Sequence, residues 1–390
     1  MPGSHNKPPY KIVGALTRFD ERENVHARYE LVPDTQEWSD FYRNHPKWER
    51  IDLKTKSLPG MMKVGHPWDL PILANERMII RMLCGDEVVD GIPSSDKQEI
   101  DPGRATEKIK GFVRHLGADL VRIGPLNPAF VYSHIGKTRS YPGRKRGTPL
   151  SLSHASAISL AIGLNTDMIK TGPVLPEYVE VSRAYLQLAI ISVTLAGYIR
   201  SLGYPARAHN LLNYQVLCVP VAIDAGMGQL GRHGLMLTKE FGSCLKLAVV
   251  TADLPLVYDP SVDIGVDDFC AQCRICAESC PSKAIPAGDK VVVRGVEKWR
   301  IVPEACFYVW NETGTDCGVC VASCPWTKPR TALHNLAREF ATRGGKAGGW
   351  MSRMDQLLYG KFKPKTHPDW MEKSEYPFTP SLNGEEGVME

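Results

Sequence analysis

Apolar positions follow helix-like and strand-like patterns in turn from about residue 106 to residue 252. The longest pattern, Pro176 to Leu202, is apolar on nearly every side between Ala184 and Ile199, with Gln187 as the main exception. A helix of that kind lies inside a protein, and Gly203 is well suited to end it. This segment therefore predicts a buried helix at the centre of a domain.

Shorter apolar runs surround this helix. Thr106 to His115 predicts a helix that Thr106 caps and Gly117 ends. Strands are expected over residues 118–123, 150–164, 216–223, 235–238 and 245–251. Helices and strands that alternate in this way predict an α/β domain, which we place at residues 106–265.

The two ends of the chain show weaker patterns. Residues 1–105 are irregular and rich in charge and proline, and we expect them to wrap over the rest, with a short helix from Glu76 to Cys84. In residues 331–390 an amphipathic helix is expected before a proline-rich tail that packs on the surface. That helix is marked by Leu333, Leu336, Ala337 and Phe340 and broken by Gly344, Gly345, Gly348 and Gly349.

Composition and charge exclude several classes of protein. The 390 residues are 43% hydrophobic and 23% charged, with a net charge of +4, which favours neither a nucleic-acid nor an anionic-membrane partner. No apolar run reaches eighteen residues, and no secretory signal is visible, so we expect no membrane span and a cytoplasmic protein. The basic segment 137–146 is expected to be a solvated loop, with an anion contact as the alternative.

Eight of the eleven cysteines fall between Phe269 and Trp326. The first run is Cys-x-x-Cys-x-x-Cys-x-x-x-Cys-Pro, the pattern of bacterial ferredoxins with cubane iron–sulfur clusters. In such proteins the fourth cysteine of each run ligates the other cluster. Residues 266–330 are therefore predicted to hold two [4Fe–4S] clusters. One is bound by Cys270, Cys273, Cys276 and Cys324, and the other by Cys280, Cys306, Cys317 and Cys320.

Two other interpretations of the cysteines are weaker. A disulfide scaffold is uncommon in a long chain without a secretory signal, and paired zinc sites show separate Cys-x-x-Cys knuckles instead of a triple-spaced run. The second run is looser than the first, since ten residues separate Cys306 from Cys317.

A glycine-rich segment follows the expected strand 216–223. Residues 226–234 contain four glycines, Gly226, Gly228, Gly231 and Gly234, which indicates a sharp turn or a backbone that a ligand approaches closely. A dinucleotide fingerprint is not favoured, because Arg232, His233 and Gly234 follow instead of a helix.

Several segments together resemble the cobalamin-dependent reductive dehalogenases. They are residues 195–204, 223–235, 249–256 running into Cys270, and 315–325, with a further likeness at 18–22. The resemblance implies a nitroreductase-like core that binds base-off cobalamin, two cubane clusters that deliver electrons, and removal of halide from an organohalide. It also implies that Tyr185 donates a proton and that Lys246 assists it. The corrinoid contacts are placed in the glycine-rich segment, at Gly226, Gly228, Gly231, Arg232 and His233.

Departures from the family qualify these expectations. No twin-arginine signal is present, which points to the cytoplasmic, catabolic branch or to a trimmed sequence. Ser243 stands where the family often has proline. No Asp-x-His-x-x-Gly occurs, in agreement with base-off binding without a histidine ligand. Without the resemblance, Tyr185 would be read as a core tyrosine and Lys246 as a solvated strand residue.

Two other functions remain open on the sequence. An epoxyqueuosine reductase also uses cobalamin and two clusters but acts on tRNA, for which a basic face is expected. A non-catalytic electron-transfer protein or cobalamin carrier would explain the cysteines but not the apolar core. The dehalogenase reading implies an external donor, a ferredoxin or a reductase.

Overall fold

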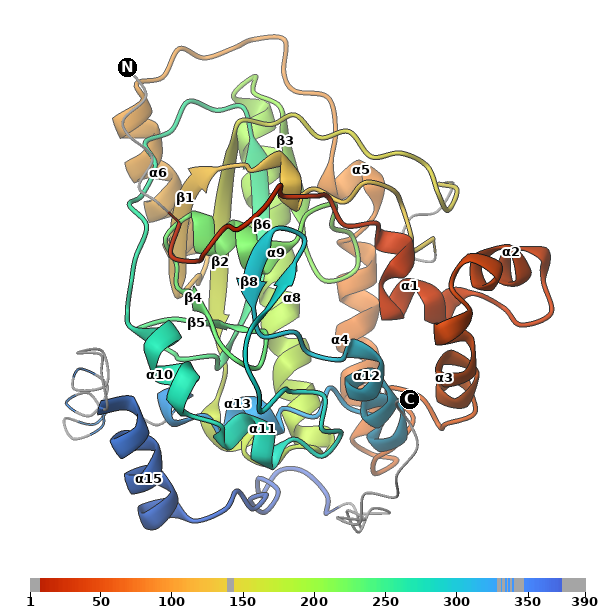
Figure 1. Ribbon diagram of the computed structural model, residues 1–390. Coiled ribbons are helices and arrows are strands. Elements are labelled where there is room, and N and C mark those ends of the chain that lie inside the picture. The colour runs from red at the N-terminus through yellow and green to blue at the C-terminus, as the bar shows by residue number, and fades with distance from the viewer. Residues whose placement is uncertain are drawn as a thin grey trace.

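A four-stranded sheet forms the centre of the computed structural model (Figure 1), which describes residues 8–138, 144–327, 331, 334, 336, 339 and 347–373. The strand order is β1–β2–β6–β3, and every pairing is antiparallel. The mixed α/β class expected from the sequence is confirmed. The strands are β1 Leu120–Pro125, β2 Ser156–Gly163, β3 Ala206–His209 and β6 Leu245–Ala252.

Helices cover both faces of this sheet. Because side chains alternate along a strand, Ala248 and Val250 of β6 pack in the core with α8, Leu175–Ser201, whereas Val249 packs with Val221 of α9, Cys218–Asp224. On the α8 side the core continues into four further helices, the last of which directly precedes α8. They are α4 Leu70–Met82, α5 Asp86–Val89, α6 Pro102–His115 and α7 Thr166–Ile169.

The buried helix expected over 176–202 is α8, and the prediction is confirmed within one residue. Among the described residues α8 is the one helix long and apolar enough to cross a membrane by length and composition. Its apolar side chains, Leu188, Leu195 and Ile199 among them, are fully buried against the sheet and α4. It therefore serves as the core helix of this fold.

The strand expected over 216–223 is wrong, because this segment forms helix α9. Short apolar runs do not distinguish a buried strand from a buried helix. Pro220 is the informative residue: it disfavours a central strand but fits the first turn of a helix, where backbone N–H groups lack partners. The cap expected at Thr106 is also wrong, since Asp101 accepts the hydrogen bond from the Arg104 backbone and caps α6.

The irregular segment expected at the N-terminus contains regular helices. A short 3₁₀ helix precedes three α-helices. Arg28, in the first of these α-helices, forms ion pairs with Asp52 at 2.7 Å and with Glu304 at 2.9 Å. The N-terminal helices thereby pack against α12 of the cluster region. Their bounds are η1 Glu21–Glu23, α1 Val25–Glu30, α2 Gln36–Asn44, α3 Pro46–Lys56 and α12 Pro303–Thr313.

The basic segment 137–146 is not a solvated loop where it is described. Lys137 is buried, lies 3.5 Å from Glu21 and stacks over Tyr214. Arg144 donates to Asp86, and Arg146 donates to the carbonyls of Ala27 and Gly136. These cations fasten the N-terminal helices to the core.

The cluster region lies at the lower end of α8, where α10, α11 and α13 gather (Figure 1). Small hairpins β4–β5 and β7–β8 and the short helix η2 complete the described elements. Their bounds are η2 Pro128–Phe130, β4 Gln229–Leu230, β5 Met236–Leu237, α10 Val266–Gln272, α11 Ile275–Ser279, β7 Val291–Val293, β8 Val296–Lys298, α13 Val319–Ala322 and η3 Pro325–Thr327.

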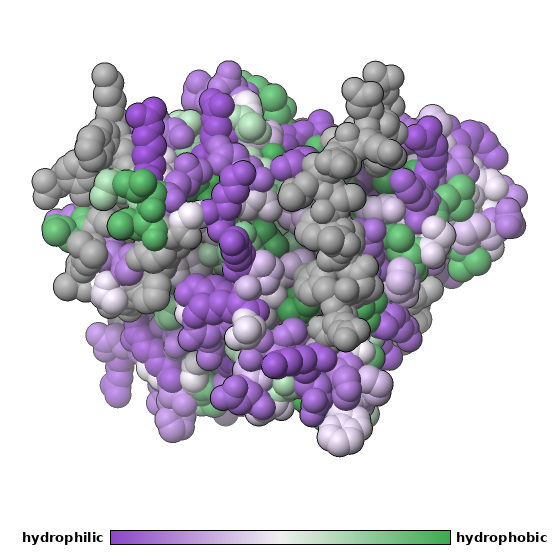
Figure 2. All heavy atoms as spheres, turned by 90° about the horizontal axis from the view of Figure 1, so that it is seen from below, coloured by the Kyte–Doolittle hydropathy of each residue, from purple (hydrophilic) through white to green (hydrophobic). Residues whose placement is uncertain are grey.

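A C-terminal helix, α15 Ala347–Tyr359, packs against α10, where the backbone of Gly349 donates to Gln272 at 3.0 Å. Gly348 and Gly349, expected to break a helix, therefore lie in its first turn. The residues that mark the other expected helix, Leu333, Ala337 and Phe340, and the glycines Gly344 and Gly345 lie outside the described residues. Seen from below, the described surface is mainly hydrophilic with scattered apolar side chains (Figure 2).

Candidate active site

The first group of cysteines surrounds Cys324. Burial raises the pKa of the Cys324 thiol, and the neighbouring thiols of Cys270, Cys276 and Cys273 raise it further. Cys270, Cys273 and Cys324 belong to one buried cluster with Phe269 and Trp326. The structure thus brings together the four thiols that the spacing assigns to one iron–sulfur cluster.

The second group is formed by the other four cysteines. Burial and the neighbouring thiols of Cys320 and Cys280 raise the pKa of Cys306. Cys317 lies within the field of Cys320 and Cys306. Each sulfur therefore has the neighbours that the crossed ferredoxin arrangement requires, and the ligand set itself stays a prediction.

The chemistry of these two groups fits cubane clusters better than single metal ions. All eight cysteines are free thiols in buried or half-buried positions, and thiolate is the ligand that iron–sulfur clusters use. Among the described residues no three Cys, His, Asp or Glu side chains are close enough together to hold one metal ion. A cubane of four irons and four sulfides holds its thiolates farther apart than one ion does.

Arg232, expected to contact the corrinoid, is directed to the first cysteine group instead. Its Nε donates to the carbonyls of Cys270 at 3.0 Å and Cys273 at 3.1 Å, and its Nη1 donates to those of Pro286 and Gly288. The guanidinium also stacks on Trp299 at 4.6 Å. Its donors are engaged by backbone oxygens, so Arg232 fastens the loop that carries these cysteines.

The glycine-rich segment is shaped by the approach of its own chain. A Cβ at Gly226, which has φ of +76°, would lie 2.0 Å from the Pro260 carbonyl oxygen, and one at Gly228 would lie 2.1 Å from that of Leu237. At Gly231 a Cβ would meet Leu237 at 2.2 Å. Of the two alternatives expected here, the sharp turn accounts for the glycines without a ligand.

His233 is buried, and burial lowers its pKa to about 4. Its Nδ1 accepts a hydrogen bond from the Leu235 backbone at 3.2 Å, so the ring belongs to the same turn. Nothing in these contacts directs His233 toward Tyr185 or Lys246. The corrinoid contacts expected in this segment therefore have no support from its geometry.

The structure does bring Tyr185 and Lys246 together. Tyr185 projects from α8, and Lys246 lies on the face of β6 that carries Ala248 and Val250 toward α8. The Lys246 Nζ lies 5.4 Å from the centre of the Tyr185 ring. Residues far apart in sequence therefore form a phenol–ammonium pair between the helix and the sheet.

Burial raises the pKa of Tyr185, and the charge of Lys246 limits the rise. For Lys246, burial would lower the pKa, but Asp316, Tyr185 and Glu177 together outweigh it and hold the pKa above its usual range. The phenol therefore keeps its proton at neutral pH, and the lysine remains an ammonium.

Two acidic residues that the sequence reasoning missed complete this site. Asp316 accepts a hydrogen bond from Lys246 Nζ at 3.0 Å, and it directly precedes the predicted ligand Cys317. Glu177, in the first turn of α8, is fully buried, and burial together with Asp316 raises the pKa of its carboxyl well above the usual range. A Cβ at Gly318 would lie 2.6 Å from Glu177 Oε1. The acids thus join the second cysteine group to the phenol–ammonium pair.

Tyr185 and Lys246 keep accessible surface although burial acts strongly on their pKa values. The Lys246 side chain keeps 22% of its surface accessible, and Tyr185 is half-buried. His26 and Cys320 are half-buried as well.

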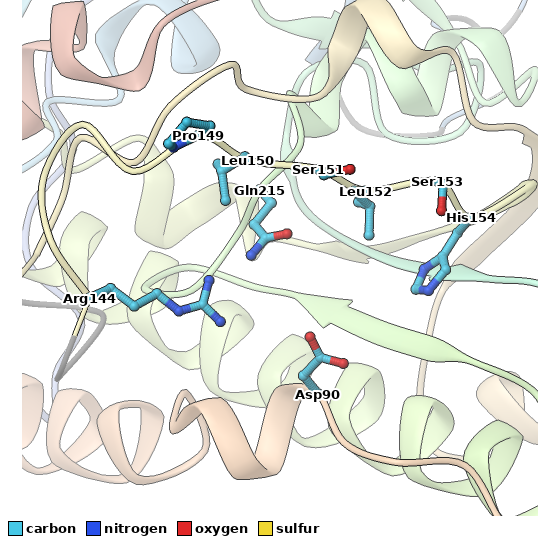
Figure 3. Close-up of a pocket in the computed structure, with 9 residues that line it drawn as sticks. All are labelled: Asp90, Arg144, Pro149, Leu150, Ser151, Leu152, Ser153, His154 and Gln215. Carbon is cyan, nitrogen blue, oxygen red and sulfur yellow. The ribbon is translucent and has the colours of Figure 1, made fainter.

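A separate pocket of about 460 Å³ lies on other elements (Figure 3). His154 lines it, and its Nδ1 lies 2.8 Å from the Thr251 hydroxyl. The Gln215 backbone donates to His209 Nδ1, so the neutral His209 donates from Nε2 to the same hydroxyl. Thr251 is near the end of β6 opposite to Lys246 and points to the other face. The pocket contains none of the site residues expected from the sequence.

A mixed α/β core joined to a domain with two ferredoxin-like cysteine groups defines the class of an iron–sulfur oxidoreductase. The model of the 4Fe-4S dicluster domain matches residues 269–328. The sequence is 31% identical over 277 residues to a tetrachloroethene reductive dehalogenase of Desulfitobacterium hafniense, covering 60% of this chain and 50% of that protein. It is 30% identical over 275 residues to the Sulfurospirillum multivorans enzyme of the same name, covering 63% and 54%.

The structure agrees with these sequence matches. The catabolic reductive dehalogenase NpRdhA superimposes with a TM-score of 0.74 and 25% identity, covering 91% of this chain and 49% of that one. Its complex with 3-bromo-4-hydroxybenzoic acid gives 0.73 and 27%, covering 91% and 48%. The chain is thus similar to reductive dehalogenases in sequence and in fold. It spans about half the length of the relatives it matches.

A shorter match connects the chain to a second family. An epoxyqueuosine reductase of Aliivibrio fischeri is 32% identical over 115 residues, covering 28% of this chain and 30% of that protein.

Proposed function

We propose that the protein is a reductive dehalogenase that replaces the halogen of an organohalide by hydrogen. The reaction breaks a carbon–halogen bond, forms a carbon–hydrogen bond, consumes two electrons and one proton, and releases halide. The observation that carries this proposal is the Tyr185–Lys246 pair, which Asp316 connects to the loop of the second cysteine group. The similarity to reductive dehalogenases supports it.

The cofactors in this proposal are two [4Fe–4S] clusters and one base-off cobalamin. The clusters would be held by the two cysteine groups, and the corrinoid would lie beside Tyr185 and Lys246, which keep accessible surface. When bound, the corrinoid supplies the reducing chemistry at the carbon–halogen bond, and the clusters supply electrons one at a time.

Tyr185 is the proposed proton donor. A phenol is a weak acid near neutrality, and burial weakens it further, so a nearby positive charge is needed to stabilise the phenolate left behind. The Lys246 ammonium supplies that charge, and Asp316 keeps it protonated and in place. A proton held on Tyr185 would then be delivered at the carbon centre that is reduced.

The second cysteine group is the one nearer to this donor. The backbone of its loop at Cys317 lies against Gly172, where a Cβ would be 2.4 Å from the Cys317 carbonyl oxygen. Asp316 of the same loop reaches Lys246, and the charge of Lys246 acts on Cys320. We therefore propose that electrons enter at the first group and leave from the second.

The donor of these electrons and the location of the protein are also proposals. An external ferredoxin or reductase would fit. All eleven cysteines are free thiols in the structure, which suits a reducing compartment such as the cytoplasm. We rank epoxyqueuosine reduction second on the shorter match described above.

The proposal is tested by halide release. The anaerobically purified protein, loaded with iron, sulfide and cobalamin and given a chemical reductant, should release halide from halogenated aromatic or alkene substrates. The same protein without cobalamin is the control and should release none. Absence of halide release together with reduction of epoxyqueuosine in a tRNA stem loop would favour the second family instead.

A further inference from the structure

The C-terminal helix α15 exposes an apolar face. Met354, Leu357 and Leu358 lie on one side of the helix by their spacing, and these residues are 41%, 80% and 64% exposed. Apolar side chains are visible at the left edge of the view from below, the side on which α15 lies (Figure 1, Figure 2). Single exposed apolar residues are ordinary on a protein surface, whereas apolar residues gathered on one face mark an interaction site.

This helix lies directly on the part of the chain that carries the first cysteine group. The Gly349 backbone donates to Gln272 of α10 at 3.0 Å, and Gln356 donates to Glu278 of α11 at 2.9 Å. Both of these short helices contain cysteines of the first group. Between them Arg274 is exposed, so this segment also reaches the surface. A protein bound to the outer face of α15 would be separated from the cysteines by one helix diameter, about 10–12 Å.

The charge along this face is positive. From residue 353 to residue 366 the chain contains four basic residues and a single acidic one, Asp355, which is half-buried. Lys365 is paired with Asp167 at 2.7 Å. The other three cations are exposed; they are Arg353, Lys361 and Lys363. An apolar centre with basic residues at its rim is complementary to an acidic surface on a partner protein.

We propose that the outer face of α15 is the docking site of an acidic one-electron carrier protein, of ferredoxin or flavodoxin type, that reduces the cluster of the first cysteine group. This inference rests on the proposed dehalogenase function and names the partner that supplies its electrons. In each encounter the carrier is oxidised by one electron and the cluster is reduced by one. Two encounters supply the two electrons that one halide release consumes.

The size of the face suits such a partner. Electron-transfer complexes are transient and bury less than about 1,200 Å² in total. One helix face with its charged rim is therefore large enough for the centre of the contact. The basic rim raises the rate of encounter with an acidic carrier, and the apolar centre excludes water from the contact.

The test measures how fast a reduced acidic flavodoxin reduces the fully loaded protein when no organohalide is present. The flavin hydroquinone becomes a semiquinone in this step, and stopped-flow absorbance of the semiquinone gives the second-order rate constant. Arg353→Glu combined with Lys361→Glu should lower this constant about 10-fold or more at low ionic strength, and the difference should shrink in high salt. Leu357→Ser should lower it about 10-fold at both salt concentrations, because an apolar contact is not screened.

Matched controls lie on α4, which is well separated from α15 (Figure 1). Arg81→Glu reverses an exposed cation, and Met82→Ser removes an exposed apolar side chain. Both should keep the wild-type rate. Photoreduction by deazariboflavin, a neutral small molecule that needs no protein contact, should be equal in all variants. Wild-type rates in the α15 variants, or equal losses in the α4 variants, would overturn the proposal.

Two further results separate this inference from its alternatives. Because the assay contains no organohalide, it reports docking even where no halide is released. A fall in iron content in Leu357→Ser would show that this leucine is structural, and the charge-reversed double variant would then decide. A wild-type dimer that Leu357→Ser dissociates would assign the face to a second copy of the chain and overturn the proposal.

Discussion

The loops that carry the two cysteine groups are held in opposite ways. Around the first group, Arg232 donates to neutral backbone carbonyls of Cys270, Cys273, Pro286 and Gly288. At the second group, the polar neighbours are the acids Asp316 and Glu177, and Asp316 bonds Lys246. Both loops are buried. Arg232 holds the first through backbone carbonyls, whereas Asp316 connects the second to the Tyr185–Lys246 pair.

The difference separates structure from chemistry in this molecule. Carbonyl acceptors do not titrate, so the Arg232 contacts hold their loop in any redox or protonation state. Asp316 of the second loop and Glu177 of α8 lie within the field of Lys246, which in turn acts on Tyr185. We therefore expect changes at the first loop to alter cluster retention, and changes at the second site to alter turnover.

Tyr185→Phe should have the largest effect. Removing the hydroxyl removes the proposed proton donor, and general-acid groups contribute about 100- to 10,000-fold to rate. Turnover should fall by that order, while iron and cobalt per chain stay at wild-type values. Steady-state halide release with parallel metal analysis checks this, and wild-type turnover in the variant would exclude Tyr185 as the donor.

Arg232→Leu should separate the two loops. Without the guanidinium, several buried carbonyls lose their donor, and each unmet group costs about 1–3 kcal/mol. The first cluster should be lost, so iron should fall from about eight to about four per chain. Iron and sulfide assays measure this change. Retention of all the iron would show that Arg232 is not needed for that loop.

Lys246→Gln should act on the second site alone. The change removes the charge that stabilises a phenolate at Tyr185, and we expect turnover to fall about 10- to 100-fold. It also leaves Asp316 buried without its partner, so the double variant Lys246→Gln with Asp316→Asn serves as the control for folding. Iron content should be unchanged in both, and loss of the second cluster would mean that Lys246 is mainly structural.

The smallest expected effect concerns the stability of the fold toward acid and comes from His233, which follows Arg232 in the chain. The pKa of His233 is about 4 in the fold, below its ordinary value of about 6.5, so the unfolded chain binds more protons between those values. Stability should fall by roughly 2 kcal/mol from pH 7 to pH 5 through this residue. His233→Gln should lessen the pH dependence of the melting temperature, and an unchanged dependence would contradict this assignment.

The sequence predicted what depends on local spacing. The cysteine runs and the buried helix over 176–202 have periodic patterns, and the structure contains the helix and groups the thiols accordingly. Tyr185 and Lys246 came from a family resemblance, and their proximity is a property of α8 and β6. Helix α9 was read as a strand because its apolar run is too short to show a period, and the N-terminal helices are short and mainly polar.

Long-range partners could not be predicted. Asp316 meets Lys246 across 70 residues, and Arg232 meets carbonyls 38 to 56 residues away. No local pattern marks such contacts. An arginine after a glycine-rich turn looks the same in sequence whether it binds a cofactor or its own backbone.

The central claim is that a corrinoid lies beside Tyr185 and that two clusters serve it. The most direct measurement is iron, cobalt and corrinoid analysis of the wild-type protein after anaerobic loading and removal of unbound cofactor. The account predicts about eight irons and one cobalt per chain. Eight irons with no retained corrinoid would contradict it and leave an electron-transfer protein.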